Sequence, residues 1–316
     1  MRPSISFLFI AFLAAACKPA GSGAVPPTTT ASAPLPPSGS TPQIPPPVAP
    51  GDIVKTSKGD LTIHPVYHAT LWLEFGGKTI VLDPWSKAET RLDAIPKADF
   101  VLVTDIHPDH YDPPALAKVK KAGTVVVAPK VVADKEPGAT MIANGDKKDF
   151  GAFSVEAVPM YNLTRGPEAG KLFHDKGRGN GYVLTFGDKR IYVSGDTECT
   201  PEMKALTNID VAFLCMNLPY TMPPSEAGEC ARAFKPKVLY PYHYRDSKPD
   251  EMGAIPGTEV RNRVWYLGRG FANPHPRPLS PSGRGELSGN PNRRAVARLP
   301  SPLGGEGPGI RVRVCS

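Results

Sequence analysis

The chain has 316 residues, of which 41% are hydrophobic, and a formal net charge of +7. This length allows one large domain or two small ones. Residues 269–316 hold eight Arg and two Glu, so most of the positive charge lies in a segment poor in core-forming residues. The rest of the chain shows no basic patch interleaved with aromatic residues, so nucleic acid is not an expected partner.

Residues 1–17 have the composition of a secretory signal peptide. One Arg precedes an apolar stretch from Ile5 to Leu13, and small residues lead to Cys17. The stretch is shorter than the roughly 20 apolar residues that a membrane span needs. Small residues directly before a Cys resemble the lipobox of bacterial lipoproteins, which implies a lipid on Cys17. We therefore expect an exported protein, anchored by lipid to a bacterial membrane and facing the periplasm or cell exterior. Cleavage after Ala16 to give a plain secreted protein is the alternative.

Two further segments hold too few core residues to fold. Residues 18–50 are rich in Pro, Thr, Ser, Ala and Gly and contain no aromatic residue, which predicts a disordered tether. Residues 269–316 are predicted to be a disordered basic tail. The predicted folded domain is therefore 51–268.

Three of the five cysteines lie in this domain, namely Cys199, Cys215 and Cys230. They show neither a CxxC spacing nor an even count. We therefore expect buried thiols rather than disulfides or a Cys-rich zinc site.

The first half of the domain predicts a hairpin, a strand, a helix and a strand. The apolar segments 71–75 and 78–82 flank Gly76-Gly77, which is typical of a hairpin turn. The run FVLVT (100–104) fits a buried strand. A helix is expected next, with Asp112 as its N-cap, followed by a strand at 124–129.

The second half repeats these elements. YVLTFGDKRIYVS (182–194) matches LWLEFGGKTIVLD (71–83) at an offset of 111, and KVLYPY (237–242) parallels the strand at 124–129. Thr200 and Ser225 are the expected starts of its helices. The pattern predicts a layered α/β domain made of two related halves.

Polar residues recur where the apolar strands end. They are Asp83, the cluster from Asp105 to His110, Asp196 and His243. Taken singly, Asp196 could begin a turn and His243 could be a hydrogen-bonded core residue. Four potential ligands directly after a buried strand, however, are a costly concentration of charge unless they bind a metal or another partner.

The segment DIHPDH (105–110) resembles the HxHxDH motif of the metallo-β-lactamase superfamily. The other family segments follow in order, as LDP (82–84), FHDKGRGNGY (173–182), SGDT (194–197) and PYHY (241–244). HATLWLEFGGKTIVLDPW (68–85) and GDTECTPEM (195–203) are most similar to the ascorbate-6-phosphate-lactonase-like and phospholipase-D-like hydrolases. The resemblance covers roughly Ile53 to Leu267 and implies a four-layer αβ/βα sandwich.

The resemblance also implies a site for two metal ions. It assigns His107 to the first ion, assigns Asp109, His110 and His243 to the second, and makes Asp196 the bridge. Asp109 and Asp196 are the predicted catalytic residues. Zn²⁺ is the expected metal.

Two positions depart from the family pattern. Asp105 stands where the first His is expected, and Asn162 stands where many relatives carry another ligand of the first ion. His174 is the expected replacement for Asn162, so the first site would consist of Asp105, His107 and His174. Its extra carboxylate makes Mn²⁺ or Fe²⁺ plausible there. The competing outcome is a single-metal site, with Asp105 acting as a base or as a residue that orients a ligand.

Asp83 and His68 are expected to orient metal ligands through hydrogen bonds. The alternative is that Asp83 caps a turn and that His68 lies in a surface loop. The loop Leu163–Gly181 carries Arg165, Lys171, Lys176 and Arg178, which could admit a small anionic substrate or simply be solvated.

The resemblance implies a hydrolase in which a metal-bound hydroxide attacks an ester, lactone, amide or phosphodiester. The alternative is a non-catalytic metal-binding or sensing lipoprotein that retains the fold. A Ser or Cys hydrolase is disfavoured, because the sequence has no G-x-S-x-G segment and Cys199 has no evident base.

Overall fold

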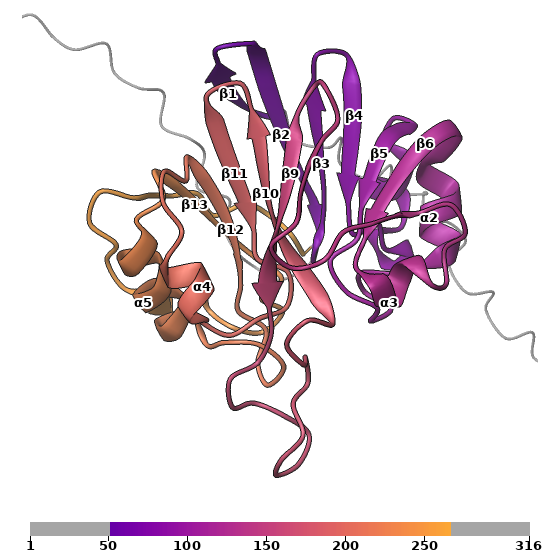
Figure 1. The fold of residues 1–316 in the computed structure, drawn as a ribbon. Coiled ribbons are helices and arrows are strands. Elements are labelled where there is room, and N and C mark those ends of the chain that lie inside the picture. Colours follow the sequence, from indigo (N-terminus) through magenta and orange to yellow (C-terminus); the bar gives the residue numbers. More distant parts are fainter. Residues whose placement is uncertain (1–50, 267–316) are drawn as a thin grey trace, which may run out of the picture.

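The computed structural model describes residues 51–266 (Figure 1). The predicted signal peptide, Cys17, tether and basic tail lie outside these residues. Within the described part of the chain, no helix is long and apolar enough to cross a membrane.

Two mixed sheets of seven strands each form the centre of the domain. The first sheet holds, in spatial order, β1 (Asp52–Thr56), β2 (Gly59–Tyr67), β3 (Thr70–Phe75), β4 (Lys78–Leu82), β5 (Ala98–Leu102), β6 (Lys120–Ala128) and β7 (Thr140–Met141). The second holds β8 (Lys147–Asp149), β9 (Ser154–Met160), β10 (Gly179–Phe186), β11 (Lys189–Val193), β12 (Val211–Cys215), β13 (Val238–Tyr242) and β14 (Glu259–Val260).

The two sheets share one topology. In each, the first four strands pair antiparallel, and the remaining three join in parallel. The hairpin pairs Phe75 with Lys78 in the first sheet and Phe186 with Lys189 in the second, which are equivalent positions in the sequence repeat. The prediction of two related halves is confirmed.

The helices lie on the outer faces of the sheets (Figure 1). The first half carries α1 (Thr90–Asp93), α2 (Pro113–Val119), α3 (Lys130–Ala133) and the 3₁₀ turn η1 (Ser86–Ala88). The second half carries α4 (Pro201–Lys204), α5 (Pro224–Phe234) and the 3₁₀ turn η2 (Pro249–Met252). A large apolar core joins the two sheets and α5, and a smaller one lies between the first sheet and its helices. The predicted four-layer αβ/βα sandwich is confirmed.

Two of the three predicted helix starts are confirmed. Asp112 accepts a hydrogen bond from the backbone N–H of Ala115, and Thr200 accepts one from that of Met203. The expected start at Ser225 is slightly late, because α5 begins at Pro224 and has no side-chain cap.

The expectation that all three cysteines are buried thiols is wrong. Cys199 and Cys230 form a disulfide, and Cys215 is the free cysteine of the described residues. The two half-cystines are 31 positions apart in sequence, but their Cα atoms are separated by 5.7 Å because α5 packs against the segment around α4.

Candidate metal centre

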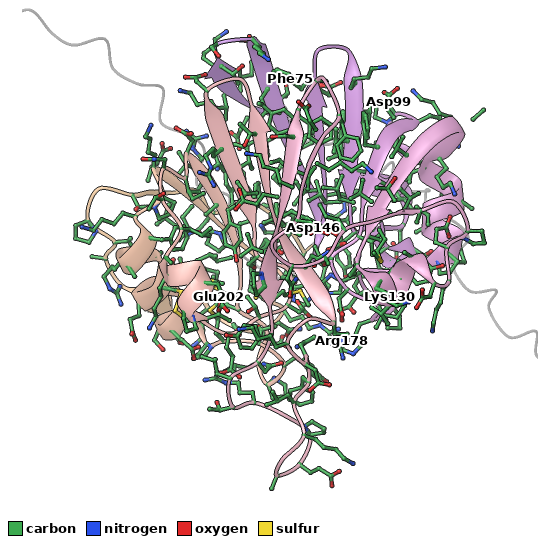
Figure 2. The ribbon with its side chains drawn as sticks, viewed as in Figure 1. Phe75, Asp99, Lys130, Asp146, Arg178 and Glu202 are labelled. Carbon is green, nitrogen blue, oxygen red and sulfur yellow. A yellow bond between two sulfur atoms is a disulfide. The ribbon has the colours of Figure 1, made fainter. Side chains whose placement is uncertain are left out.

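The site lies at one edge of the two sheets, where several strands end. Asp83 follows β4 directly, the cluster that begins at Asp105 follows β5, Asp196 follows β11, and His243 follows β13 directly. The carboxyl ends of parallel strands meet at the same edge, so these residues converge from distant parts of the chain. Phe75, at the hairpin turn, lies at the opposite end of the molecule from this edge (Figure 2).

Three residues of the site have a left-handed backbone. The φ angles are 56° at His68, 44° at Asp83 and 49° at His243. This conformation costs a non-glycine residue about 1–2 kcal/mol, and such strain concentrates at functional sites. In each case it ends a strand abruptly, so that the side chain leaves the sheet and enters the site.

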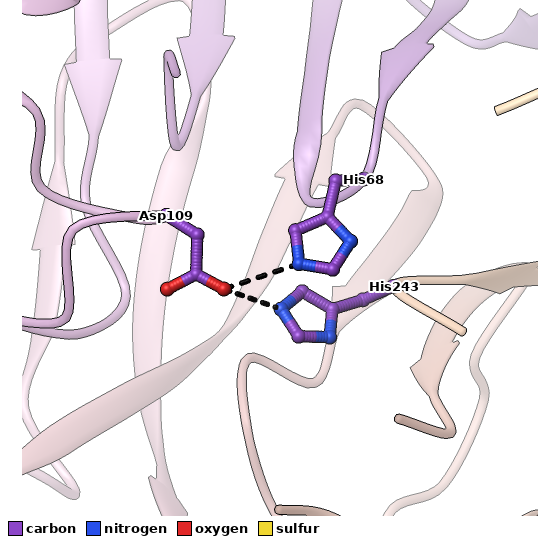
Figure 3. A group of neighbouring side chains, drawn as sticks. All are labelled: His68, Asp109 and His243. Carbon is purple, nitrogen blue, oxygen red and sulfur yellow. Dashed lines mark hydrogen bonds and ion pairs between the residues drawn. The ribbon is translucent and has the colours of Figure 1, made fainter. Parts of the chain in front are cut away.

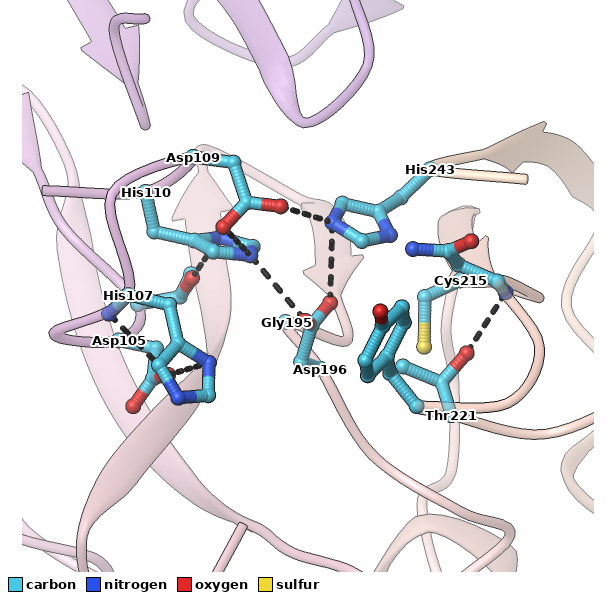
Figure 4. A network of polar contacts seen from close by, with 12 residues as sticks. Asp105, His107, Asp109, His110, Gly195, Asp196, Cys215, Thr221 and His243 are labelled. Atoms are coloured by element: carbon cyan, nitrogen blue, oxygen red, sulfur yellow. Dashed lines mark hydrogen bonds and ion pairs between the residues drawn. The ribbon is translucent and has the colours of Figure 1, made fainter. Parts of the chain in front are cut away.

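One group of ligand atoms surrounds Asp196 (Figure 4). Its Oδ2 lies 3.3 Å from Nε2 of His110, and its Oδ1 lies 3.3 Å from Nε2 of His243. The same nitrogen of His243 is 3.4 Å from Oδ2 of Asp109. These separations are too long for strong hydrogen bonds but suit atoms that share a ligand.

The buried atoms of this group fit a divalent cation. Nε2 of His110, Nε2 of His243 and Oδ1 of Asp196 have no hydrogen-bond partner among the described residues. Buried polar atoms are seldom left unpaired, and imidazole nitrogens with carboxylate oxygens form the usual donor set for Zn²⁺. Asp109, His110, Asp196 and His243 would therefore hold such an ion.

Asp83 sets the orientation of His110. Its Oδ2 lies 2.8 Å from Nδ1 of His110, while Thr104 donates to both of its carboxylate oxygens. The contact with Nδ1 leaves Nε2 of His110 directed toward Asp196. Burial raises the pKa of Asp83, and it also opposes charge on His110. The neighbouring carboxylates of Asp196, Asp83 and Asp109 outweigh that burial and raise the pKa of His110 well above its usual value.

His68 approaches Asp109 from the end of β2 (Figure 3). Its Nε2 lies 3.1 Å from Oδ2 of Asp109, and its ring centroid is 3.7 Å from that of His243. Nδ1 contacts the hydroxyl of Tyr266 at 2.6 Å. Burial, followed by the charge of His243, lowers the pKa of His68 to about 3. A neutral His68 can thus orient Asp109 or serve as a further nitrogen ligand.

A second group contains Asp105, His107 and His174. Oδ2 of Asp105 is 3.0 Å from Nδ1 of His107 and 4.0 Å from Nε2 of His174. Nε2 of His174 lies nearer to Oδ2 of Asp196, at 3.4 Å. Burial lowers the pKa of His107. The guanidinium of Arg178 also enters this group and donates to both oxygens of Asp105, at 3.1 and 2.8 Å.

Asn162 lies behind His174 rather than among the ligand atoms. Its Oδ1 accepts hydrogen bonds from the backbone N–H of His174, at 2.8 Å, and contacts Nδ1 of the same residue at 2.7 Å. Its amide nitrogen donates to Glu198, a buried carboxylate that also accepts from the backbone N–H of Arg165. Glu198 is not among the site residues predicted from the sequence, although it directly follows the SGDT segment.

A sequence model of the β-lactamase superfamily domain matches residues 62–243, more than half of the chain. The chain belongs to this superfamily. A UPF0173 metal-dependent hydrolase of Bacillus thuringiensis (strain Al Hakam) is 31% identical over 193 residues, which is 56% of this chain and 82% of the relative. A UPF0173 metal-dependent hydrolase of Thermococcus onnurineus (strain NA1) is 29% identical over 185 residues, 55% of this chain and 80% of the relative.

Solved structures agree with the superfamily assignment. A protein of Parabacteroides distasonis ATCC 8503, named as a metal-dependent hydrolase, is 42% identical, with a TM-score of 0.64 over 67% of this chain and 97% of its own. The metallo-β-lactamase fold protein YhfI of Bacillus subtilis shares the fold at 14% identity, with a TM-score of 0.51 over 62% and 88% of the chains. The chain is therefore a metal-dependent hydrolase of this superfamily.

The metal centre of this superfamily member opens into a pocket of about 250 Å³. Asp109, His174 and Asp196 line it, together with Phe173, Tyr220 and Arg245. The rings of Phe173 and Tyr220 pack edge to face, with centroids 5.1 Å apart. The pocket thus combines an apolar wall with one exposed cation.

The loop that could admit an anion or simply be solvated has its four cations paired. Arg165 pairs with Glu198 and Glu226, Lys171 with Glu168, Lys176 with Glu202, and Arg178 with Asp105. Among the described residues that line the pocket, the cation is Arg245. It follows the PYHY segment and lies outside this loop.

Proposed function

We propose that this enzyme hydrolyses an ester, lactone, amide or phosphodiester bond of a small anionic molecule outside the cytoplasm. The observation that carries the proposal is the set of unpartnered buried atoms on His110, Asp196 and His243, which adjoin a pocket lined by Arg245. A divalent ion held there supplies Lewis acidity, which activates water and polarises the bond under attack.

Zn²⁺ is the ion we propose for the group formed by Asp109, His110, Asp196 and His243, because imidazole nitrogens make up half of its ligands. The charges of His243 and His110 overcome burial and hold the pKa of Asp196 well below its usual value. Burial also opposes charge on Asp109, but the charge of His110 and the hydrogen bonds of His243 and His68 outweigh it and lower the pKa of Asp109. Both carboxylates therefore stay ionised at neutral pH and favour a bound cation.

The pocket residues would orient the substrate around this ion. Arg245 can pair with a carboxylate or phosphate of the substrate, and Phe173 with Tyr220 offers an apolar surface to the rest of it. Asp83 and His68 keep His110 and Asp109 aligned through the contacts described above.

The rival function is metal binding or sensing without catalysis. The departure at Asp105, whose carboxylate is paired with Arg178, favours it. The test is to measure turnover of chromogenic phosphodiesters, lactones, esters and amides by the metal-loaded protein. Asp196→Asn, which keeps the shape of the side chain, is the matched control. Turnover that is lost in the control and on chelation supports the enzyme, whereas full metal occupancy with no turnover of any class supports the rival.

We also propose that the protein is exported and anchored through a lipid on Cys17. The disulfide between Cys199 and Cys230 supports export, because disulfides persist in oxidising compartments and are rare in the cytosol. Labelling cells with a fatty-acid probe should mark the wild type, and Cys17→Ala should remove both the label and the protein from the membrane fraction. An unlabelled wild type in the soluble exported fraction would instead support cleavage after Ala16.

A further inference from the structure

Asp105 occupies the first position of the metal motif, but its carboxylate is already neutralised. The side chain is fully buried, and both of its oxygens accept hydrogen bonds from the guanidinium of Arg178, at 3.1 Å from Nε and 2.8 Å from Nη2. Paired, charge-assisted hydrogen bonds of this kind are among the strongest in proteins. Asp105 therefore contrasts with Asp196, whose Oδ1 is buried without a hydrogen-bond partner among the described residues.

The backbone builds this contact, although the two residues are 73 positions apart in sequence. The N–H of Asn180 donates to the carbonyl of Thr104 at 2.9 Å, which fixes the start of β10 beside the end of the β5 segment. A side chain at Gly179 would place its Cβ 2.9 Å from that carbonyl oxygen, so only glycine allows this approach. Nη1 of Arg178 also donates to the carbonyl of Phe173 at 2.9 Å, which holds the guanidinium from its other side.

The guanidinium adjoins the atoms that a first metal ion would use. Its Nη2 is 2.8 Å from Oδ2 of Asp105 and 3.4 Å from Nε2 of His107. A divalent ion bound to these two residues would lie beside a fixed positive charge and would compete with the guanidinium for both oxygens of Asp105. His174 is turned toward the other group, since its Nε2 is nearer to Asp196 than to Asp105, at 3.4 against 4.0 Å.

The net charge of the site also argues against a metal ion at Asp105. The family motif has a neutral His at the position of Asp105, and here an aspartate and an arginine replace it with a pair of zero net charge. The pair preserves the charge of the site, and both carboxylate oxygens are engaged by the guanidinium instead of by a metal ion.

We infer that Arg178 is a built-in cation that takes the place of the first metal ion, so that each chain binds a single divalent ion at Asp109, His110, Asp196 and His243. This role of Arg178 rests on the proposed metal centre and makes it mononuclear. The guanidinium then holds Asp105 and His107 near the ion as fixed polar groups.

The test is the number of metal ions that each protein binds, measured by titrating the metal-free full chain with Co²⁺ and following its visible absorbance. The wild type should saturate at one equivalent. Arg178→Met, which keeps the length of the side chain but not its charge, should saturate at two. Arg178→Lys, which keeps the charge, should stay at one.

Lys176→Met is the matched control, because it removes a cation from the same loop that pairs with Glu202 instead of Asp105. It should also stay at one equivalent. Saturation of the wild type at two equivalents would overturn the inference, even if Arg178→Met does not fold. A count of one in a folded Arg178→Met would overturn it too.

Turnover assays separate this inference from the proposed function. A wild type that binds one ion and hydrolyses no substrate class leaves the role of Arg178 in place and removes the catalytic proposal. A wild type that binds two ions and is active removes the role of Arg178 and leaves the catalytic proposal in place.

Discussion

The disulfide between Cys199 and Cys230 should make a measurable contribution to the free energy of unfolding. It joins the segment that follows Asp196 to α5, and both half-cystines are buried. Replacing both by alanine frees a loop of 31 residues in the unfolded chain. In the loop-entropy relation this lowers the free energy of unfolding by about 3.7 kcal/mol at 25 °C.

This loss should be visible in thermal unfolding. A change of 1 kcal/mol shifts the melting temperature of a domain of 150–250 residues by roughly 2–4 °C, so Cys199→Ala with Cys230→Ala should melt about 7–15 °C below the wild type. Circular dichroism or calorimetry measures the shift at equal protein concentration. Dithiothreitol should lower the melting temperature of the wild type toward that of the double variant.

The double variant is also the control for the reductant. Since it has no disulfide between these positions, dithiothreitol should leave its melting temperature unchanged. The reasoning is refuted if the double variant melts within about 2 °C of the wild type, less than 1 kcal/mol by the same conversion. An equal effect of the reductant on both proteins would show that the agent acts elsewhere.

Three further predictions follow from single contacts. Asp83→Asn removes the carboxylate that orients His110, so the metal affinity measured by Co²⁺ titration should fall about 10–100-fold. An unchanged affinity would mean that Asp83 only caps a turn. Arg245→Met should raise KM for anionic substrates about 10-fold or more, because it removes a charge-assisted contact of about 1.5 kcal/mol or more. The kcat, and the KM for neutral substrates, should stay nearly unchanged. Equal effects on both kinds of substrate would contradict this. Asp52→Asn tests a pH effect on folding, since burial of Asp52 is outweighed by the hydrogen bonds from Arg263, which lower its pKa in the folded state. Its contribution to stability is therefore full above the unfolded pKa of about 3.9 and is lost as the pH falls through the lower folded value. In urea unfolding, the free energy of unfolding of the wild type should exceed that of the variant at pH 7, and this difference should shrink below about pH 4. A difference that is constant with pH would exclude this carboxylate as the cause.

The sequence by itself was sufficient for the architecture. The apolar runs, the Gly76-Gly77 turn and the repeat at an offset of 111 are local or periodic signals, and they predicted both halves and their order. The positions of most site residues could also be predicted, because strands that run in parallel bring their carboxyl ends to one edge whatever the details of packing. Asp83, Asp196 and His243 are recognisable as the polar residues that end such strands.

Only the tertiary structure decided which side chains meet. The pairing of Asp105 with Arg178, the position of Asn162 behind His174, and the disulfide all join residues brought together by the register of β10 or the packing of α5. A pattern of residue types carries no information about such contacts, since a loop cation looks the same in sequence whether it faces solvent or a buried carboxylate. The proposal of a single-metal site therefore depends on the contact of Arg178, which the sequence showed only as one of four cations in a loop.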